Sequence, residues 1–442
     1  MDWQSLYRAR LTTAAEAVTR IKPGDRVVLG HAAGSPEVLV EAMVANAAAY
    51  RDVEIVHLLP MGPTAYCEPR YAANFRHNAL FAGGPTRTAI EEGRADFTPV
   101  FFHQTPRLLR TSLPVDVAMV QVSPPDEHGY CSLGVSVDYT KPAAEAARLV
   151  IAQVNPNMPR THGDSFLHVS RLDVVVETDV KLIELPRPPI GPVEAAIGRN
   201  CAELVHDGDT LQLGIGAIPD AVLAQLGGKK DLGIHSEMLS DGIVDLIEAG
   251  VVTNARKSIN VGRCVVTFLM GSQRLYDFVD DNPLIQAAPV DYVNDPRVIA
   301  QNDNMVAINS CIQVDLSGQV VAGSVGPRQI SGIGGQADFV RGATLSRGGR
   351  VIMAIPSTAR GGKASKIVPF IEPGAAVSTM RCDTDYVVTE FGIAQLWGQT
   401  LKERARRLIA IAHPTFREDL AAEFQRRFAS PLSAEENSCV SS

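Results

Sequence analysis

The chain partly repeats itself, and this repeat limits the possible folds more than any other feature of its 442 residues. Residues 24–39 read GDRVVLGHAAGSPEVL, and residues 208–223 read GDTLQLGIGAIPDAVL. Both have Gly-Asp, an apolar run ending in Leu-Gly, a loop of small residues, a proline and a Val-Leu pair. A strand, a tight loop and a helix explain this order, because proline suits the first turn of a helix. The repeat therefore predicts two related domains in tandem.

Two weaker repeats follow in the same order along the chain. GGPTRTAIEEGRADF at 83–97 is echoed by VGPRQISGIGGQADF at 325–339. DVAMVQ at 116–121 is echoed by DYVVTE at 385–390. Any one of these matches can arise by chance in a sequence rich in Gly and Ala, but three in the same order favour a duplicated architecture.

The boundary between the two halves is expected in the proline-rich stretch LPRPPIGPV at 185–193, because repeated prolines suppress helix and favour an extended connector. We therefore predict an amino-terminal domain at 1–186 and a carboxyl-terminal domain at 187–442. The polar segment beyond Ser430 is expected to fray, as chain ends commonly do.

Short apolar runs rich in β-branched residues occur through both halves and are typical of buried parallel strands. They are RVVLG, VEIVHLL, VDVAMVQV, LDVVVE, TLQLG, VVTFLMG, RVIMAIP and DYVVTE. Helical patterns lie between several of them, as in SPEVLVEAMVANAA, AIPDAVLAQLG and DGIVDLIEAG. This alternation predicts an α/β fold with mainly parallel sheets. Ligands of such sheets bind beyond the carboxyl ends of the strands, so the loops after strands are expected to carry the chemistry.

The composition excludes collagen-like, disordered and coiled-coil proteins. Hydrophobic residues make up 45% and charged residues 20%, which is ordinary for a globular chain. The formal net charge of -8 disfavours a nucleic-acid binder, so local donors must hold any anionic ligand. Seven scattered cysteines without a CxxC pair support neither a disulfide framework nor a cysteine zinc site. The charged amino terminus and the absence of a long apolar run predict no secretory signal, no membrane span and a cytoplasmic location.

The segment LQLGIGAIPD at 211–220 is the first candidate binding loop. A strand is expected to end at Leu213, Gly214 and Gly216 form a loop of small residues, and Pro219 falls where a helix begins. Free backbone N–H groups at a helix start bind anions. A dinucleotide fingerprint, G-x-G-x-x-G, fits less well, because Pro219 replaces the third glycine. A plain tight turn also fits these residues.

Glu237 follows the next expected strand along the chain. The run LGIH ends before Ser236-Glu237-Met238, and Asp241 is the expected N-cap of the helix that follows. This order places Glu237 at the carboxyl end of a strand, one strand–helix unit after the glycine loop. A carboxylate among apolar neighbours serves as a nucleophile or a general base. A solvated loop glutamate is the commoner alternative, and these residues alone leave both open.

Two further loops combine glycines with polar side chains. In SGIGGQADFVRGA at 331–343, glycines surround Gln336 and Asp338, which lets a ligand approach the backbone closely, although a loop of unusual path has the same composition. His128, in SPPDEHGYCSLG at 123–134, invites a metal or acid–base interpretation. No HExxH or other close ligand cluster accompanies it, so we expect a structural loop histidine and no metal site.

Taken together and in this order, the motifs resemble the family I CoA-transferases, in the branch that holds acetyl-CoA hydrolases/transferases and 4-hydroxybutyrate CoA-transferases. GIHSEM followed by SGIGGQADF is the most specific part of the resemblance. The length of the chain, near 440 residues, is more similar to that of the 4-hydroxybutyrate and butyrate enzymes than to that of the longer hydrolases. The resemblance implies tandem α/β domains of the CoA-transferase (NagB/RpiA-like) type. The matching segments are SPPDEHGYCSLG, NPNMPRTHGDSFLH, LQLGIGAIPDAV, GIHSEMLSDG, INSCIQVDLSGQV, SGIGGQADF and DYVVTEFGIAQLWG.

The resemblance implies an acyl-CoA:carboxylate CoA-transferase in which Glu237 is the nucleophile. The Glu237 carboxylate attacks the acyl-CoA thioester to give an acyl-glutamyl anhydride, and the CoA thiolate then forms a glutamyl-CoA thioester, with ping-pong kinetics. The resemblance also implies residues that bind the oxyanion and CoA, namely Gly214, Ile215, Gly216, Ala217, Ile218, Asn309, Gly332, Gly334, Gly335 and Gln336. Because CoA carries phosphates, we expect Lys363 or Lys366 to contact them. The loop of Gly34, Ser35 and Pro36 is expected to close the acyl pocket.

The resemblance leaves the substrate open among acetate, butyrate, 4-hydroxybutyrate, propionate, succinate and itaconate. Hydrolysis of the same glutamyl thioester gives the alternative of an acyl-CoA hydrolase, and a non-catalytic CoA-binding protein is a third class. We expect no permanently bound cofactor, because CoA itself is the substrate and part of the covalent intermediate. The expected partners are an acyl-CoA and a short-chain carboxylate, with no nucleic acid and no membrane, and a homodimer or homotetramer is implied by the resemblance alone.

Overall fold

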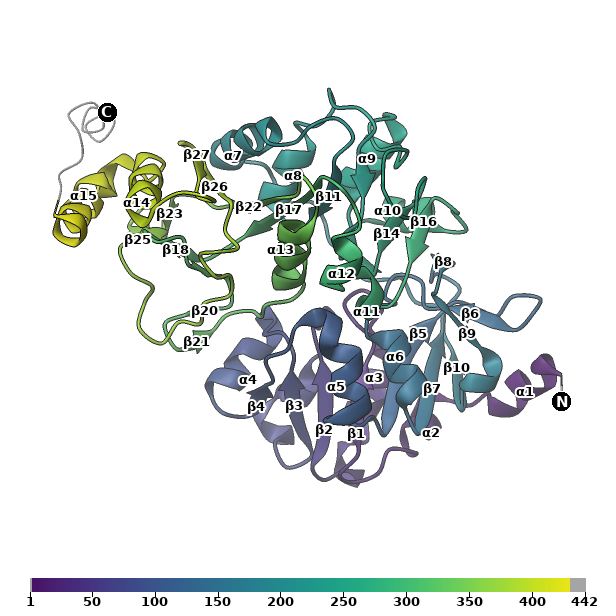
Figure 1. Cartoon of the computed structure of the whole chain (residues 1–442). Helices are drawn as coiled ribbons and strands as arrows, with labels where there is room; N and C mark the ends of the chain where they lie inside the picture. The colour runs from purple at the N-terminus through teal and green to yellow at the C-terminus, as the bar shows by residue number, and fades with distance from the viewer. Residues whose placement is uncertain (1, 430–442) are drawn as a thin grey trace.

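The structure is a computed structural model that describes residues 2–429. The chain forms two lobes, one from its purple and blue first part and one from its teal to yellow second part (Figure 1). The polar segment that we expect to fray beyond Ser430 lies outside the described residues. Within residues 2–429, no helix combines the length and the apolar character needed to cross a membrane.

A seven-stranded parallel sheet forms the core of the first lobe. In sheet order its strands are β10 (Val174–Glu177), β7 (Leu149–Val154), β5 (Val117–Val122), β1 (Arg26–Leu29), β2 (Val53–His57), β3 (Phe75–Ala79) and β4 (Ala95–Phe97). β1 lies between β5 and β2, and Val27 is opposite both Val117 and Ile55. β5 is buried at every position, as expected for a parallel strand with both faces covered. The helices of this lobe are α1 (Trp3–Arg10), α2 (Ala14–Val18), α3 (Glu37–Ala45), α4 (Arg87–Glu91), α5 (Thr105–Thr111) and α6 (Thr140–Ala146).

A six-stranded sheet forms the core of the second lobe. In sheet order its strands are β12 (Gly233–Ile234), β11 (Thr210–Leu213), β17 (Met305–Ser310), β22 (Arg350–Ala354), β26 (Tyr386–Thr389) and β27 (Gly392–Gln395). All pairings are parallel except that of β26 with β27. The helices are α7 (Pro192–Glu203), α8 (Ala217–Leu223), α9 (Asp241–Glu248), α10 (Gln273–Val279), α11 (Val290–Val293), α12 (Pro296–Ile299), α13 (Gln336–Leu345), α14 (Leu401–Ala410) and α15 (Pro414–Phe428).

Short strands lie outside the two main sheets, and one group of them links the two lobes. β14 (Cys264–Val266) pairs with β16 (Ile285–Ala287), and β16 pairs with β8 (His162–Gly163), which comes from the first part of the chain. β13 (Met238–Leu239) pairs with β15 (Phe268–Leu269). The remaining short strands are β6 (Tyr130–Ser132), β9 (Phe166–His168), β18 (Gln313–Asp315), β19 (Val320–Val321), β20 (Ser324–Val325), β21 (Arg328–Gln329), β23 (Thr358–Ala359), β24 (Ala364–Ser365) and β25 (Ile367–Val368).

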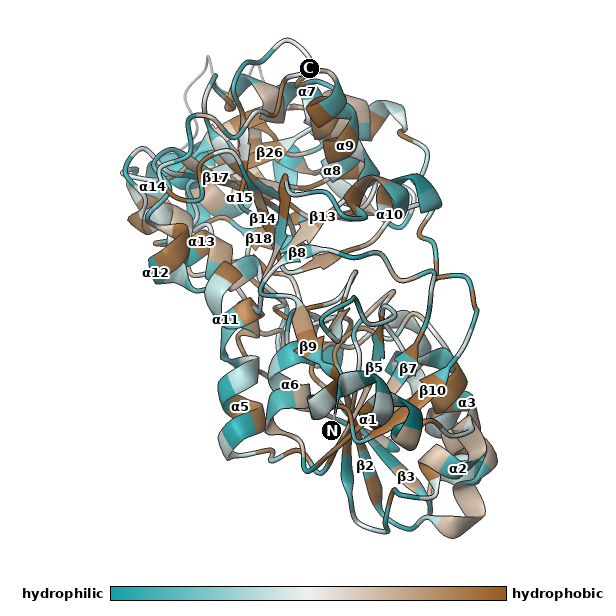
Figure 2. Cartoon of the chain, turned by 90° about the vertical axis from the view of Figure 1, so that its right-hand side faces the viewer, coloured by the Kyte–Doolittle hydropathy of each residue, from teal (hydrophilic) through white to brown (hydrophobic). Residues whose placement is uncertain are grey.

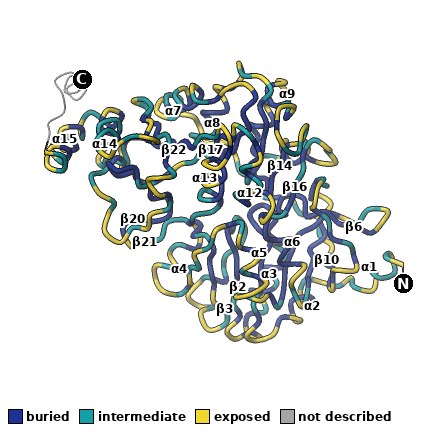
Figure 3. Tube along the Cα trace, in the orientation of Figure 1, coloured by how far each residue is buried: buried dark blue, intermediate teal, exposed yellow. Residues whose placement is uncertain are grey.

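Burial follows the layers of the two lobes. The strands of both sheets are mainly dark blue in Figure 3, and the exposed residues, in yellow, lie mostly in helices and loops at the periphery. In Figure 2 apolar residues gather along the strands inside each lobe. The cores consist mainly of Val, Ile, Leu and Ala, which explains why a chain with only 6% aromatic residues still fills two large sheets.

Each of the eight apolar runs contains a strand, and the predicted α/β class with mainly parallel sheets is confirmed. VVTFLMG divides into β14 and β15, which belong to different small sheets. The first repeat is matched in structure, since β1 and β11 are each followed by a loop and a helix.

The other repeats do not carry over in the same way. Ala-Asp-Phe is strand β4 in the first lobe but lies in helix α13 in the second, so the 83–97 and 325–339 echo is a coincidence of composition. The third echo gives β5 and β26, which are both strands. However, β5 lies beside β1, whereas β17 and β22 separate β26 from β11.

Candidate active site

Hydrogen bonds with neighbouring segments of the second lobe fix the backbone of Glu237. β11 and β12 are parallel neighbours, so the loops after them meet at one sheet edge. The Ser236 hydroxyl donates to the Leu213 carbonyl at 3.1 Å and joins these two loops. The Glu237 carbonyl accepts hydrogen bonds from the N–H groups of Thr267 at 3.0 Å and Phe268 at 3.1 Å. Glu237 therefore occupies a rigid position after a strand, as its sequence context predicts.

Glu237 lines a cavity of about 270 Å³. Most of the sequence-predicted contacts line the same cavity, although they come from loops far apart in the chain. The shared residues are Gly214, Ile215, Asn309, Gly332, Gly334, Gly335 and Gln336. The remaining lining residues are His31, Leu58, Leu59, Phe81, Gln212, Leu213, Met238, Phe268, Met270, Ser310, Ala322, Ser331 and Ile333.

The environment of the Glu237 carboxyl favours its neutral form. Its pKa is raised to about 8, chiefly because the carboxyl is removed from bulk water, with smaller contributions from the nearby carboxylates of Asp338 and Asp138. Two donors oppose this shift: Asn294 Nδ2 donates to Oε2 at 2.9 Å, and the Gly335 N–H also donates to the carboxyl. The residue keeps partial exposure because it faces the cavity. Glu237 is therefore a desolvated carboxyl held by two N–H donors.

Gly335 is required here for its lack of a side chain. A Cβ atom at this position would lie 1.7 Å from Glu237 Oε2 and 2.4 Å from Asn294 Nδ2. Its φ of -89° is accessible to any residue, so the contact with Glu237, rather than backbone strain, demands glycine. This explains why a glycine precedes Gln336, the first residue of α13.

Asn294, Asp338 and His103 form a chain of polar contacts that begins at the Glu237 carboxyl. Asn294 Nδ2 lies 2.9 Å from Glu237 Oε2 and 3.5 Å from Asp338 Oδ2, so one amide group lies between two carboxylates. Asp338 accepts from His103 through Nδ1 at 2.6 Å and through the backbone N–H at 3.0 Å. Asn294 Oδ1 is buried and has no hydrogen-bond partner within residues 2–429. His103 comes from the first lobe and Asp338 from the second, so both lobes build this network.

The glycine loop after β11 differs in detail from the predicted set. Gly214 and Ile215 line the cavity, and Gly216, with φ +114°, is the N-cap of α8. Ala217 and Ile218 are the first two residues of α8 and are not among the lining residues. Asn309 and Gln212 form an amide pair on the cavity wall, with N···O distances of 3.1 and 3.3 Å.

Several other sequence-predicted residues lie outside the cavity wall. Gly34, Ser35 and Pro36 are buried behind it, and His31 is the residue of their loop that lines the cavity. Lys363 is exposed, whereas Lys366 is partly buried. Burial lowers the pKa of Lys366, and the nearby Cys311 and Glu390 oppose this shift. Neither lysine lines the cavity.

Two smaller expectations can also be compared with the structure. His128 lies on an exposed loop, and its Nε2 is 3.3 Å from Glu127 Oε1. The N-cap of α9 is Ser240 rather than Asp241. Asp241 is the first helical residue, and its carboxylate instead accepts from the N–H and hydroxyl groups of Ser272, at 2.9 and 2.6 Å. Within residues 2–429, no three His, Cys, Asp or Glu side chains are grouped as a metal site.

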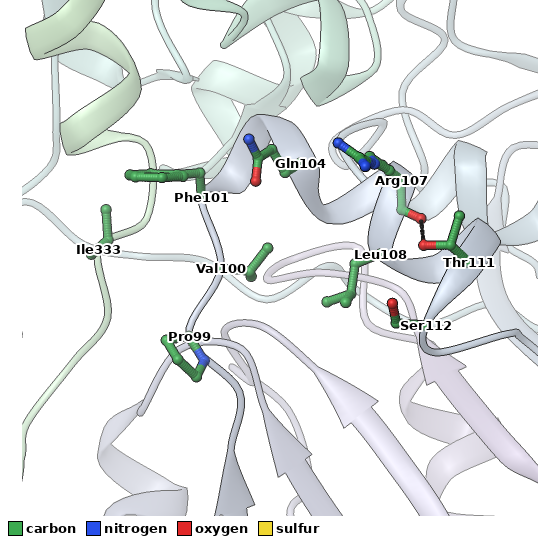
Figure 4. Close-up of a pocket in the computed structure, with 9 residues that line it drawn as sticks. All are labelled: Pro99, Val100, Phe101, Gln104, Arg107, Leu108, Thr111, Ser112 and Ile333. Atoms are coloured by element: carbon green, nitrogen blue, oxygen red, sulfur yellow. Dashed lines mark hydrogen bonds between the residues drawn. The ribbon is translucent and has the colours of Figure 1, made fainter.

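A larger hollow lies outside the site, along α5. It has a volume of about 630 Å³ and is lined by Pro99, Val100, Phe101, Gln104, Arg107, Leu108, Thr111, Ser112 and Ile333. Figure 4 shows Ile333 at one end near Phe101, and Thr111 and Ser112 at the other. Among residues 2–429, no carboxylate lines this hollow, whereas Glu237 lines the smaller cavity. Ile333 lines both hollows, so the larger one begins beside the cavity that Glu237 lines.

Two family models match this chain. The acetyl-CoA hydrolase/transferase N-terminal domain matches residues 1–185, and the acetyl-CoA hydrolase/transferase C-terminal domain matches residues 271–424. The 4-hydroxybutyrate coenzyme A transferase of Clostridium kluyveri is 59% identical over 97% of this chain and 100% of its own length. The chain belongs to the acetyl-CoA hydrolase/transferase family. The resemblance stated from its motifs is therefore confirmed, and so is the prediction that it is a CoA-transferase.

Other relatives of this CoA-transferase agree in length and fold. The succinyl-CoA:cyclohexane-1-carboxylate CoA transferase of Geobacter metallireducens is 47% identical over 96% of this chain and 97% of its own. The crystal structure of RipA from Yersinia pestis is 41% identical, covers 97% of this chain and 100% of its own, and has a TM-score of 0.91. An acetyl-CoA hydrolase, that of Yarrowia lipolytica, is more distant at 27% identity over 80% of this chain.

Proposed function

We propose that this CoA-transferase moves CoA from an acyl-CoA to a short-chain carboxylate through a thioester on Glu237. The observation that carries the proposal is the position of the Glu237 carboxyl, which faces the cavity between two glycine-containing loops and is held by Asn294 and Gly335. A desolvated carboxylate is a stronger nucleophile than a hydrated one, since no water shell has to leave before attack. The raised pKa of Glu237 reports that desolvation.

In the first half-reaction, a Glu237 oxygen attacks the thioester carbonyl, the C–S bond breaks and CoA leaves as the thiolate. The thiolate then attacks Cδ of the acyl-glutamyl anhydride, the bond from Cδ to the bridging oxygen breaks, and the donor acid leaves with that oxygen as a carboxylate. The acceptor carboxylate reverses both steps and leaves as a new acyl-CoA. No net proton transfer is needed, because each step exchanges one anion for another.

The glycine loops are proposed to bind the oxyanions and the CoA thiol end. Backbone N–H groups near Gly214 and near Gly334 and Gly335 are the candidate donors to the tetrahedral intermediates, and loss of one such donor typically costs ~3 kcal/mol. Asn309 is paired with Gln212 on the same wall, where it is placed to contact the pantetheine arm. Gly216, Ala217 and Ile218 at the start of α8 remain proposed contacts, as do Lys363 and Lys366 for the phosphates and Gly34, Ser35 and Pro36 for the acyl pocket.

The acyl group is proposed to be short and monocarboxylic, as in 4-hydroxybutyrate, butyrate or acetate. The near relative of Clostridium kluyveri is named for 4-hydroxybutyrate. Within residues 2–429, no Lys or Arg side chain lines the cavity, so a second carboxylate would be buried without a cationic partner. This composition favours monocarboxylic over succinate- or itaconate-type acids.

Transfer and hydrolysis use the same intermediate and are separated by one experiment. Protein is incubated with acetyl-CoA alone and with acetyl-CoA plus butyrate, and both acyl-CoA products and free thiol are measured. A transferase makes butyryl-CoA and little free thiol, whereas a hydrolase releases thiol in both mixtures. In parallel, peptide mass spectrometry is expected to find a CoA adduct on Glu237, absent from Glu237→Gln. An adduct on another residue, or turnover by Glu237→Gln, rejects the assignment.

Three further proposals concern the domain division, the cellular location and the assembly of the chain. We place the domain division at 186/187, in the proline-rich connector between the two sheets. A cytoplasmic location follows from the sequence prediction, and a homodimer or homotetramer follows from the family resemblance. Light scattering of the purified chain tests the assembly directly.

A further inference from the structure

The cavity wall contributed by the first lobe contains one polar side chain. Leu58, Leu59 and Phe81 line this wall with apolar atoms, and His31 is the remaining residue. The amide, hydroxyl and glycine groups that line the cavity come from the second lobe, on the side proposed for CoA. The wall from the first lobe therefore suits the acyl chain, and His31 is the group there that distinguishes one acyl chain from another by hydrogen bonding.

The neighbours of His31 fix which ring nitrogen carries its proton. His31 Nδ1 lies 3.0 Å from Asp138 Oδ2, and both side chains are fully buried. Asp138 also accepts from the Ser136 hydroxyl at 2.7 Å and from the N–H groups of Tyr139 and Thr140 at 2.6 and 3.2 Å. A carboxylate surrounded by donors is an acceptor, so Nδ1 is the protonated nitrogen. In the neutral ring Nε2 is then an acceptor.

His31 Nε2 is buried and has no hydrogen-bond partner in the part of the chain that the structure describes. The ring cannot turn to find one, because it is held by Asp138 and lies between Phe268, at 4.7 Å between ring centroids, and Tyr139, at 5.5 Å. Buried acceptors are normally paired. His31 therefore lines the cavity with one ring nitrogen, Nε2, that has no donor of its own.

We propose that His31 Nε2 accepts a hydrogen bond from a hydroxyl group on the acyl chain and so gives the enzyme a preference for hydroxyacids. The inference rests on the proposed function, since it concerns the acyl site of the same cavity. Methylene groups of the chain lie against Leu58, Leu59 and Phe268, and the hydroxyl proton fills the vacant acceptor. A site built to hydrogen-bond a hydroxyl discriminates strongly against the analogue that lacks it.

The test compares 4-hydroxybutyrate with butyrate as acceptors from acetyl-CoA. His31→Asn is the informative variant, because its amide can still donate to Asp138 while no atom remains at the Nε2 position. We expect kcat/KM for 4-hydroxybutyrate to fall about tenfold or more, and kcat/KM for butyrate to change less than about threefold. His31→Gln, which places a polar atom near the Nε2 position, is expected to recover part of the preference.

His57 provides the matched control. It is also buried, its Nδ1 lies 3.3 Å from the Tyr66 hydroxyl, and its Nε2 lacks a partner among the described residues, but it does not line the cavity. His57→Asn is expected to leave the ratio of the two kcat/KM values unchanged.

An equal loss of both activities in His31→Asn, or a wild-type enzyme that does not prefer 4-hydroxybutyrate, overturns the inference. The CoA adduct on Glu237 separates this result from failure of the proposed function. If the wild type forms the adduct and transfers CoA without hydroxyl preference, only the role of His31 is wrong. If no adduct forms with any acyl-CoA, the proposed function is wrong and the inference falls with it.

Discussion

Two histidine–aspartate pairs flank Glu237, and they differ in burial and in what they contact. His31 and Asp138 are both fully buried in the first lobe, and Asp138 accepts several further hydrogen bonds. His103 has 22% of its side chain exposed, and its partner Asp338 belongs to the other lobe. Only Asp338 shares a donor with Glu237, through Asn294.

The difference indicates two separate tasks for the same chemical pairing. The His31 pair forms a buried part of the cavity wall with one unpaired nitrogen, whereas the Asp338 pair is proposed to adjust the charge and position of the Glu237 carboxyl. Both aspartates raise the pKa of Glu237, and Asp338 contributes more than Asp138. Variants that separate positioning, charge and packing therefore test whether the two pairs are distinct.

The largest effect is expected from Gly335→Ala, which disturbs the hydrogen bond between Asn294 and the Glu237 carboxyl. The added methyl group would overlap Glu237 Oε2 and Asn294 Nδ2, so the carboxyl must move by about 1 Å or more. A displacement of this size typically costs about 100-fold in rate. We expect kcat to fall by about that factor in a steady-state assay, with little change in the circular dichroism spectrum.

Gly227→Ala is the matched control for this substitution. No atom lies within 4 Å of a Cβ at Gly227, and its φ is not in the left-handed region. It is expected to keep wild-type activity. Activity of Gly335→Ala within a few-fold of wild type would show that the carboxyl does not need this space.

The glycine clusters and Glu237 could be predicted from the sequence, but the side chains behind them could not. Gly214, Gly334 and Gly335 stand in local motifs, and parallel-strand topology brings such loops to one edge. Asn294 and His103 come from a short helix end and a turn of a 3-10 helix, and neither has a motif. Their approach to Asp338 depends on how the two lobes pack, which no local pattern encodes.

The cavity wall from the first lobe illustrates the same limit. The sequence points to Gly34, Ser35 and Pro36 as the acyl-pocket residues. In the structure the Gly34 N–H donates to the His31 carbonyl, and it is His31 that lines the cavity. The sequence repeat shows that this loop corresponds to the loop at 214–218. It does not show which residue of the loop faces inward.

A second prediction concerns packing and contrasts the two aspartates directly. Asp138→Asn replaces a buried carboxylate that accepts from five groups, so we expect the free energy of unfolding to fall by about 3 kcal/mol in urea titrations. Asp338→Asn, which has a partly exposed partner, is expected to lose clearly less. Equal losses would remove the structural distinction between the pairs.

A third prediction concerns charge. The nucleophile must be ionised, so kcat/KM of the wild type is expected to rise with pH and level off above about 8. Asp338→Asn removes the stronger of the two nearby negative charges, so the midpoint of this rise is expected to fall by about one pH unit. Asp138→Asn is expected to shift it less. A pH profile that is identical in wild type and Asp338→Asn contradicts the role of Asp338 as the charge that tunes Glu237.

The last prediction concerns the stability of Glu237→Gln and its dependence on pH. The pKa of Glu237 is about 8 in the folded chain against 4.5 for the ordinary side chain, so the folded state holds a proton that the unfolded state has lost between these values. The wild type is therefore destabilised as pH rises from about 4.5 to 8, whereas Glu237→Gln has no such penalty. Differential scanning calorimetry is expected to give the variant a Tm a few degrees above wild type at pH 8 and an equal Tm near pH 5. A constant difference at both pH values would mean that the carboxyl is well solvated, and then neither histidine–aspartate pair would be acting on a desolvated nucleophile.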